Sequence, residues 1–546
     1  MRLIVALLSA LFLLGPAHAA FLILQAGAPS TAPPTGVATF GGSGTTYYIS
    51  SAGSDSNNGT AKATPWAHAP GMPGCTSTCA GNTPTAGANY VFRGGDTWHF
   101  ANSSLTPYTG GSWAVSTSGN STDCNFRPYA SPGHSTCVYY GIDPTWYSGG
   151  AWSRPIMNLD NPTSTSFVAS CAYNQYNFTG INITGTYVTV DNLEFTGICA
   201  SQVTTYKSAS YIVENGTHIN VLNSYFHGWT EATGSPLGTD FLGAIFGANG
   251  GGSGSFNIHR YDVFDGSDSY CSGSGACTGW ALQAEGYDLD HSVARHMANG
   301  IAGSNSMVFL TDNLFELNYE SWDSTVHSNL AEQNTLLTSN VPVYVYNNLI
   351  RSNNVGVNLW PEPYATLYVF NNISYSEGHG GANCFMLDQT VTTTTAYYFN
   401  NTIDAPCAWP HLSSHVTYTG SLVYENNQFI GYSPLTLTSV YNGSLTGSVT
   451  DTGSELFQSE ATANGQGYTS SNAYAVTAGG VTIGAGTNMT TFCNTLADAT
   501  ASAACKKAST VVSYNSGAHQ VVLNDGVALR GAVAWDAGAY QFANGN

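Results

Sequence analysis

The chain has 546 residues, of which only 8% are charged, and its formal net charge is −20. Such an acidic chain is expected to bind no nucleic acid and to repel acidic polysaccharides unless a cation bridges them. The length suffices for one long repeat array with a continuous core, so several separate domains are not required.

The N-terminus reads as an export signal. Residues 1–20 combine Arg2, an apolar run at 4–14 and the small-residue cleavage site Ala17-His-Ala19, which predicts a secretory signal peptide. The apolar run is too short to span a bilayer, and no other stretch of the sequence could span one. Residues 21–45 are rich in Ala, Pro, Gly, Ser and Thr and are interpreted as a flexible linker. We therefore expect a secreted or cell-surface protein without a membrane span.

A six-residue phrase recurs in the second half of the chain. Its four copies carry an Asn-Asn pair after alternating apolar residues, and the first Asn falls at 347, 371, 400 and 426, in steps of 24, 29 and 26 residues. The alternation predicts strands, and a period of about two dozen residues without helices predicts the coils of a parallel β-helix. Coils stacked about 4.8 Å apart would let inward Asn side chains bond one another in a ladder.

The repeat extends through nine coils when the sequence is aligned on the first Asn. Three residues after this position the side chain is usually apolar, which predicts an inward column, and the next residue is expected to point outward. The register of the middle coils could slip by one residue. The predicted ladder positions are Asn192, Asn223, Arg260, His291, Asp312, Asn347, Asn371, Asn400 and Asn426.

The start of the structured region carries a resemblance. A short strand at 47–49 is followed by a Gly/Ser/Asp/Asn loop at 50–60, by Pro65-Trp66 and by a Gly-Asp-Thr turn at 95–97. This order resembles the cap and first coil of secreted right-handed parallel β-helix proteins of the pectin-lyase-like superfold. A Pro-, Gly- and Cys-rich insert at 67–88 departs from the pattern and replaces most of the usual capping helix.

The end of the chain carries the same resemblance. The phrase Trp535-Asp-Ala-Gly-Ala-Tyr540 resembles the closing strand of these proteins, and residues 491–507 could form a short capping helix. The resemblance implies an all-β fold, a single right-handed parallel β-helix with a loop-rich N-terminal cap and a short C-terminal cap. It selects no function, because the superfold hosts lyases, hydrolases, esterases, adhesins and inert spacers. The expected regions are 46–180 (cap and first coils), 181–433 (regular coils) and 434–546 (C-terminal coils and cap), together one domain at 46–546.

The cysteines suggest a stapled exported protein. There are twelve, an even number, which fits an oxidising compartment. A zinc site at Cys75 and Cys79 is the alternative, but no second Cys/His pair stands nearby at finger spacing. The six local disulfide pairings expected are Cys75/Cys79, Cys124/Cys137, Cys171/Cys199, Cys271/Cys277, Cys384/Cys407 and Cys493/Cys505.

In three middle coils the predicted ladder position holds Arg, His or Asp instead of Asn. Departures from a repeat often mark functional residues, so these coils are a candidate site. These residue types suit acid–base chemistry, although each could equally form an ordinary ion pair. The candidate catalytic residues are Arg295, His296, Glu316, Glu320, Asp323 and His327. The candidate substrate-binding residues are Arg260, His291, Trp322, Arg351 and Trp360.

Three kinds of function remain open. Glycoside hydrolysis needs two carboxylates about 5–10 Å apart. β-Elimination from a uronate needs a base and a cation or Ca²⁺, but no lysine lies between Lys207 and Lys506. Asp262, Asp265 and Asp268 could hold Ca²⁺, although turn formation explains them as well. Without catalysis, the many Tyr and Trp side chains suit glycan binding or adhesion.

We therefore expect an exported carbohydrate-active β-helix, a polysaccharide lyase or glycoside hydrolase acting on an extracellular polysaccharide. The acidity of the chain favours neutral or weakly acidic glycans. A non-catalytic glycan-binding or adhesive surface protein is the alternative. Ca²⁺ is the one candidate cofactor, and the sequence predicts no particular oligomeric state.

Overall fold

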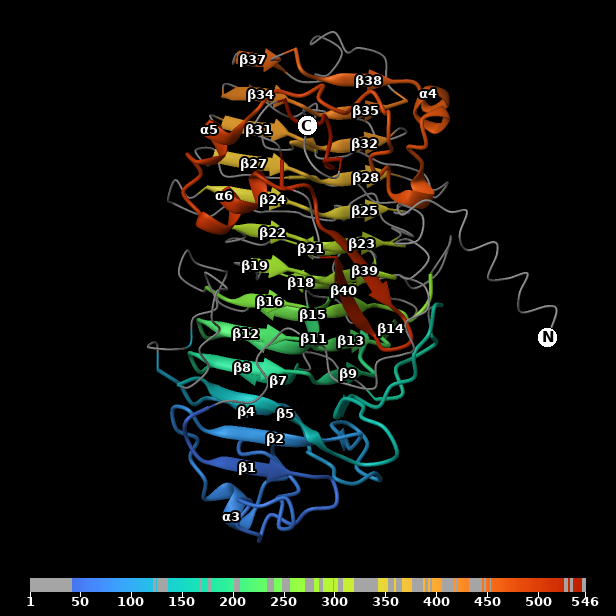
Figure 1. The fold of residues 1–546 in the computed structure, drawn as a ribbon. Coiled ribbons are helices and arrows are strands. Elements are labelled where there is room, and N and C mark those ends of the chain that lie inside the picture. Colours follow the sequence, from blue (N-terminus) through green and yellow to red (C-terminus); the bar gives the residue numbers. More distant parts are fainter. Residues whose placement is uncertain are drawn as a thin grey trace, which may run out of the picture.

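Parallel strands stacked coil upon coil form the body of the protein in the computed structural model (Figure 1). The structure describes residues 42–120, 124, 136–166, 168–173, 179–200, 207–232, 240–247, 256–270, 279–283, 288–297, 299–302, 308–318, 342–351, 358–359, 366–375, 386–387, 391–392, 395–404, 417–418, 420–431, 444–445, 448–451, 453–524, 529–530 and 534–542.

Three parallel sheets line the solenoid. Sheet A comprises, in spatial order, β1 (Thr46–Ile49), β2 (Asn89–Gly94), β5 (Val138–Tyr147), β8 (Val188–Asp191), β12 (Ile219–Leu222), β16 (Ile258–Arg260), β19 (Asp288–Asp290), β22 (Phe309–Thr311), β24 (Val343–Tyr346), β27 (Thr366–Phe370), β31 (Thr395–Phe399), β34 (Ser421–Glu425) and β37 (Ser448–Asp451). Sheet B comprises β3 (Thr97–His99), β6 (Ile156–Asn158), β9 (Glu194–Thr196), β13 (Tyr225–His227), β17 (Val263–Asp265), β20 (Val293–Arg295), β23 (Leu314–Glu316), β25 (Leu349–Arg351), β28 (Ile373–Tyr375), β32 (Thr402–Asp404), β35 (Gln428–Ile430) and β38 (Leu456–Gln458).

The third side is shorter in the described part of the chain. Sheet C comprises β4 (Trp113–Val115), β7 (Thr179–Ile183), β11 (Lys207–Glu214), β15 (Asp240–Gly247), β18 (Trp280–Gln283) and β21 (Asn299–Ala302). Small parallel sheets join β10 (Cys199–Ala200) to β14 (Thr230–Glu231), β26 (Asn358–Leu359) to β29 (Met386–Leu387), and β30 (Val391–Thr392) through β33 (Thr417–Tyr418) to β36 (Ser444–Leu445). Each strand pairs with its counterpart one coil away, which is the right-handed parallel β-helix that the sequence predicted.

An asparagine ladder runs along the tight turn between sheets A and B, but the second Asn of each pair forms it. The Asn372 amide donates to the Asn401 carbonyl oxygen at 3.0 Å and receives the Asn348 amide at the same distance. The first Asn instead adopts the left-handed conformation, with φ of 56° at Asn371 and 55° at Asn400. Asn tolerates that conformation better than most residues, so the two members of the pair have different tasks.

The predicted register is wrong by one residue in one middle coil. Arg260 ends β16, and Tyr261, with φ of 58°, takes the left-handed turn position. Asp262 therefore occupies the ladder position, Phe264 points inward and Asp265 points outward. The alignment was shifted by one residue here because this coil has Tyr261-Asp262 at the positions where later coils have the Asn-Asn pair.

The solenoid interior is filled by stacked side chains from the three sheets. On sheet B, Phe195, Phe226 and Phe264 stack with ring centroids 4.7 and 5.1 Å apart. These rings join the largest cluster of buried apolar residues, which continues from coil to coil. Because every coil buries its apolar face against the next, each strand is held from both sides.

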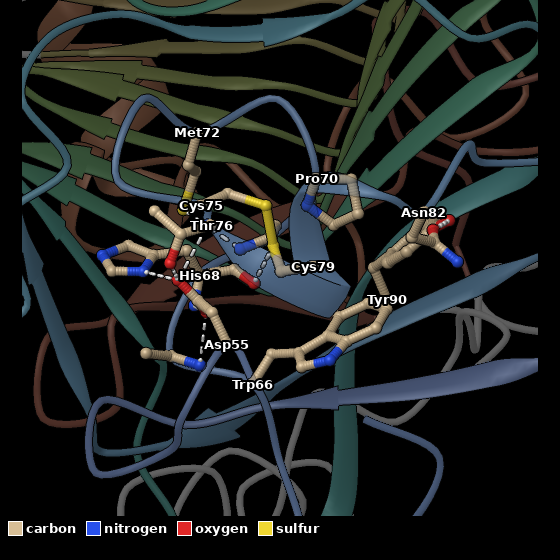
Figure 2. The surroundings of a disulfide bond; sticks show 12 residues. Asp55, Trp66, His68, Pro70, Met72, Cys75, Thr76, Cys79, Asn82 and Tyr90 are labelled. Carbon is tan, nitrogen blue, oxygen red and sulfur yellow. Dashed lines mark hydrogen bonds and ion pairs between the residues drawn. A yellow bond between two sulfur atoms is a disulfide. The ribbon is translucent and has the colours of Figure 1, made fainter. Parts of the chain in front are cut away.

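The N-terminal cap is organised around Asp55. Its carboxylate accepts from the backbone amides of Ala67, His68 and Thr76 and lies 2.8 Å from the His68 Nδ1 (Figure 2). The insert predicted from the sequence contains only one short helix, α3 (Ser77–Ala80), which the Cys75–Cys79 disulfide ties to the loop before it.

The C-terminal segment folds back along the outside of the solenoid instead of closing its end (Figure 1). The helices α5 (Thr490–Cys493) and α6 (Ala499–Cys505) pack on the outer face of sheet A, and the hairpin β39 (Val511–Asn515)–β40 (Gln520–Asn524) lies across sheet B. The helix α4 (Glu460–Gly465) and the 3₁₀ helix η4 (Ser470–Asn472) precede them. The backbone of Trp535 forms an isolated antiparallel bridge with Gly486, and residues 534–542 contain no strand, so the closing strand expected there is wrong.

Four of the six expected disulfides lie in the described part of the chain, and all four are confirmed: Cys75–Cys79, Cys124–Cys137, Cys171–Cys199 and Cys493–Cys505. The other two pairings fall outside the described residues. No helix in the described ranges is long and apolar enough to cross a membrane.

Candidate active site on the outer face of sheet B

A row of charged side chains crosses the outer face of sheet B. Strand pairing places His227, Asp265, Arg295, Glu316 and Arg351 at equivalent outward positions of successive coils. Neighbouring side chains in such a row are about 4.8 Å apart at the backbone. We call these five residues, with their neighbours Glu194, Asp268 and His296, the charged seam.

Two arginines share one carboxylate at the upper end of the seam. Arg351 binds one Glu316 oxygen through Nε and Nη2 at 2.9 and 2.7 Å, and the Arg295 Nε lies 3.5 Å from the other oxygen. Glu316 is only 6% exposed. A buried carboxylate needs such partners, because without them its charge would be uncompensated in the interior.

An imidazole and a carboxylate meet in the middle of the seam. The His296 Nδ1 lies 2.5 Å from an Asp265 oxygen, and the His296 Nε2 lies 3.4 Å from the Arg295 Nη2. Burial would raise the pKa of Asp265, but the hydrogen bond and charge of His296, with the charges of Arg295 and His227, lower it below its ordinary value. Asp265 is therefore an ionised acceptor at neutral pH.

The lower end of the seam holds a histidine between two partly exposed carboxylates. The His227 Nδ1 lies 2.9 Å from an Asp268 oxygen and its Nε2 lies 3.2 Å from a Glu194 oxygen. Burial would lower the pKa of His227, but hydrogen bonds to Asp268 and Glu194 raise it to about 9. The imidazole therefore carries a positive charge between two carboxylates, whose side chains are 33% and 22% exposed.

The C-terminal hairpin contributes side chains to the seam. The Tyr514 hydroxyl lies 3.3 Å from an Asp265 oxygen and 2.8 Å from the His519 Nδ1. The Arg295 guanidinium sits 4.5 Å from the centre of the Tyr514 ring. His519 stacks on Tyr225 at 4.3 Å. Sequence reasoning missed these residues because nothing in the repeat pattern indicates that the C-terminal segment returns to these coils.

The predicted site residues fall into three groups. Arg295, His296, Glu316 and Arg351 come together in the seam. Arg260 and His291 lie apart from the seam, where the strands β16 and β19 of sheet A end. The Arg260 Nε lies 3.2 Å and the His291 Nδ1 lies 3.5 Å from the same Asp290 oxygen. Glu320, Trp322, Asp323, His327 and Trp360 lie outside the described residues.

The three Asp residues that the sequence suggested as Ca²⁺ ligands have separate partners in the structure. Asp262 lies in the ladder, where it accepts from the Ser224 backbone amide at 2.8 Å, whereas Asp265 and Asp268 face different histidines of the seam. Within the described part of the chain no group of three or more His, Cys, Asp or Glu side chains could hold a metal ion.

Comparisons with known proteins give similarity to solved structures alone. No protein-family model and no curated protein matches the chain. A lacto-N-biosidase of family GH136 from Eubacterium ramulus shares 11% identity, with 76% of this chain and 68% of that chain covered and a TM-score of 0.34. The pectate lyase Pel9A shares 13% identity over 78% of this chain and 81% of that one, with a TM-score of 0.31.

A rhamnogalacturonan lyase shares 14% identity, with 72% of this chain and 78% of that chain covered and a TM-score of 0.30. At such similarity, the fold of the present chain is established by its own strand pairing, coil by coil. The choice of function therefore depends on the charged seam.

Proposed function

We propose that the protein is an exported carbohydrate-active enzyme, a polysaccharide lyase or glycoside hydrolase, that acts on an extracellular polysaccharide at the charged seam. The observation that carries this proposal is the placement of Glu194 and Asp268 on opposite nitrogens of His227. The two contact distances and the width of an imidazole limit the separation of the bound oxygens to about 8 Å, within the range of roughly 5–10 Å for paired glycosidase carboxylates.

The same group offers the parts of an elimination reaction. A carboxylate can take a proton, and the His227 imidazolium with Arg295 can stabilise the negative charge that develops on the substrate. Glu194 and His227 stand on the paired strands β9 and β13, and Asp268 follows β17 by three residues, so the stack of coils holds their geometry without further ordering. In this proposal the Glu194 and Asp268 carboxylates supply the base, and the His227 imidazolium held between them supplies the acidic proton and the electrostatic stabilisation.

The remaining candidates keep the roles that the sequence suggests. Arg295, His296 and Glu316 form the catalytic neighbourhood, and Arg351 contacts substrate from the upper end. Further along the chain, the segment after Glu316 would supply Glu320, Asp323 and His327, while Trp322 and Trp360 would stack against sugar rings. Arg260 and His291 would contact substrate outside the seam.

Export is supported by the signal-like segment at 1–20 and by four disulfides in the described residues. Ca²⁺ is retained only as a condition to test, because it would bridge an acidic substrate to this acidic chain.

A non-catalytic glycan-binding or adhesive role is the second candidate. It is favoured by the mutual pairing of the seam charges and by the burial of Glu316 and Asp265 at 6% and 5% exposure. In this role the paired, buried charges hold the C-terminal hairpin on the solenoid and take no part in catalysis.

One incubation separates these functions. The mature protein is mixed with neutral and acidic polysaccharides, with and without Ca²⁺, and products are followed by ultraviolet absorbance and mass. New unsaturated ends establish a lyase, and saturated reducing ends a hydrolase. Glu194→Gln and Asp268→Asn should each reduce the rate at least about a hundredfold, whereas Glu460→Gln, on the exposed start of α4, should not change it.

Two outcomes contradict the proposal. If no polymer is cut, the protein is not an enzyme of this class, and retention by one polymer would support the binding role. If a polymer is cut but both seam variants keep the full rate, the reaction occurs elsewhere. Asp323→Ala and His327→Ala, measured in the same way, then test the segment after Glu316.

A further inference from the structure

A large bulge interrupts sheet A near its N-terminal end. Phe92 pairs with Ile142 and Gly94 pairs with Tyr147, so one residue of β2 faces four residues of β5. We call residues 143–147 the aromatic bulge. Bulges re-aim side chains and are built features of a sheet. None of these five residues belongs to a core cluster, so the packing of the solenoid does not explain them.

The bulge carries aromatic rings to the outer surface. Trp146 meets the ring of Tyr48 edge-on, with centroids 5.2 Å apart, and both side chains are partly exposed. Tyr147 is 38% exposed. Rings held in this way offer rigid, amphipathic contact area at low conformational cost, which suits the CH face of a sugar.

A compensated charge pair lies beside these rings. The Lys62 Nζ lies 2.7 Å from an Asp143 oxygen and 3.0 Å from the Thr145 hydroxyl, and 6.0 Å from the centre of the Tyr48 ring. Because Asp143 already balances the charge of Lys62, the pair presents donors and acceptors without a net charge. Such a group suits sugar hydroxyls and offers no free cation to a uronate.

We propose that the aromatic bulge, with Tyr48 and Lys62, binds a neutral saccharide unit of a polysaccharide. The saccharide contacts the rings of both Trp146 and Tyr147, and its hydroxyls bond to the Lys62–Asp143 pair. The coil of β5 and β6 lies two coils before that of His227, about 10 Å along the solenoid axis, so a bound chain can also reach the seam. The ligand class rests on the proposed carbohydrate function, but binding here does not require cleavage.

The test is native-gel retardation of the full-length mature protein by soluble neutral polysaccharides (a β-glucan, a mannan and an arabinan) and by polygalacturonate. We expect at least one neutral polymer to retard the protein. Trp146→Ala and Tyr147→Ala should each weaken that retardation about tenfold, while Trp146→Phe keeps most of it. Phe256→Ala removes an aromatic ring that is 40% exposed elsewhere and should leave binding unchanged.

The outcomes are distinct from those of the cleavage assay. Retardation that Trp146→Ala and Tyr147→Ala weaken supports the proposal, whether or not the polymer is cut. Absence of retardation by every neutral polymer, retardation that both variants leave intact, or preferential binding of polygalacturonate would each overturn it. Tyr147 is exposed, so its variant keeps the test decisive if Trp146→Ala fails to fold.

Discussion

The buried Asp262 side chain in the ladder should make the stability of the protein depend on pH. Asp262 stands in a column of uncharged residues, with Ser224 before it and Ser292 after it, and its side chain is fully buried. Burial raises the pKa of its carboxyl well above the ordinary value of 3.8, despite the nearby charge of Arg154. The folded protein therefore keeps a proton there that the unfolded chain releases.

The sign and size of the effect follow from proton linkage. Because the pKa is raised in the folded state, stability falls as pH rises above 3.8, by up to about 1.4 kcal/mol per pH unit, until the folded-state pKa is reached. Asp262→Asn removes this loss. Between about pH 4.5 and 6.5 its advantage over the natural chain should therefore grow with pH, for as long as the pH stays below the raised folded-state pKa.

The variant should also gain a ladder bond. Asn372 and Asn401 each donate to a carbonyl of the previous coil, at Val345 and Val369. The same geometry directs an Asn at 262 toward the carbonyl of Val221, and a neutral buried hydrogen bond contributes about 1 kcal/mol.

Urea unfolding followed by tryptophan fluorescence at about pH 4.5, 5.5 and 6.5 measures the effect. Asn372→Asp is the reciprocal control. It puts a carboxylate opposite the Val345 carbonyl and should destabilise the protein more as pH rises. Equal shifts of the Asp262→Asn midpoint at every pH would refute the linkage argument.

Three further predictions follow from other contacts. His227→Gln should cost about 3 kcal/mol more near pH 6 than near pH 10, because a pKa raised from 6.5 to about 9 stabilises the fold below 6.5 and loses that effect as pH rises through 9; urea midpoints against pH would show it. Cys493→Ser with Cys505→Ser removes the bond between α5 and α6 and should expose that segment to limited proteolysis, with roughly 2–4 kcal/mol lost. Gly141→Ala would place Cβ 2.4 Å from the Tyr139 hydroxyl and should lower the melting temperature, whereas Gly150→Ala, with no neighbouring atom within 4 Å of the added Cβ, should have a smaller effect.

The charged seam also shows where sequence reasoning ends. Arg295, His296, Glu316 and Arg351 could be grouped because each stands at a fixed offset from the repeat. Asp265 could not, because its coil lacks the Asn-Asn marker and the alignment slipped by one residue. A slip of one residue moves every side chain of a strand to the opposite face, so the predicted register put Phe264 at the outward position that Asp265 occupies.

Local pattern was sufficient for the solenoid itself. Alternating apolar residues, the Asn-Asn pairs and the spacing of the cysteines predicted the parallel β-helix and the four disulfides seen in the described residues, since each coil contacts only its neighbours. Only the tertiary structure decided where the C-terminal segment lies. The contact of Tyr514 with Asp265 joins residues 249 positions apart, and no period in the sequence encodes it. It arises because the outer faces of sheets A and B carry apolar side chains that the returning helices and hairpin bury.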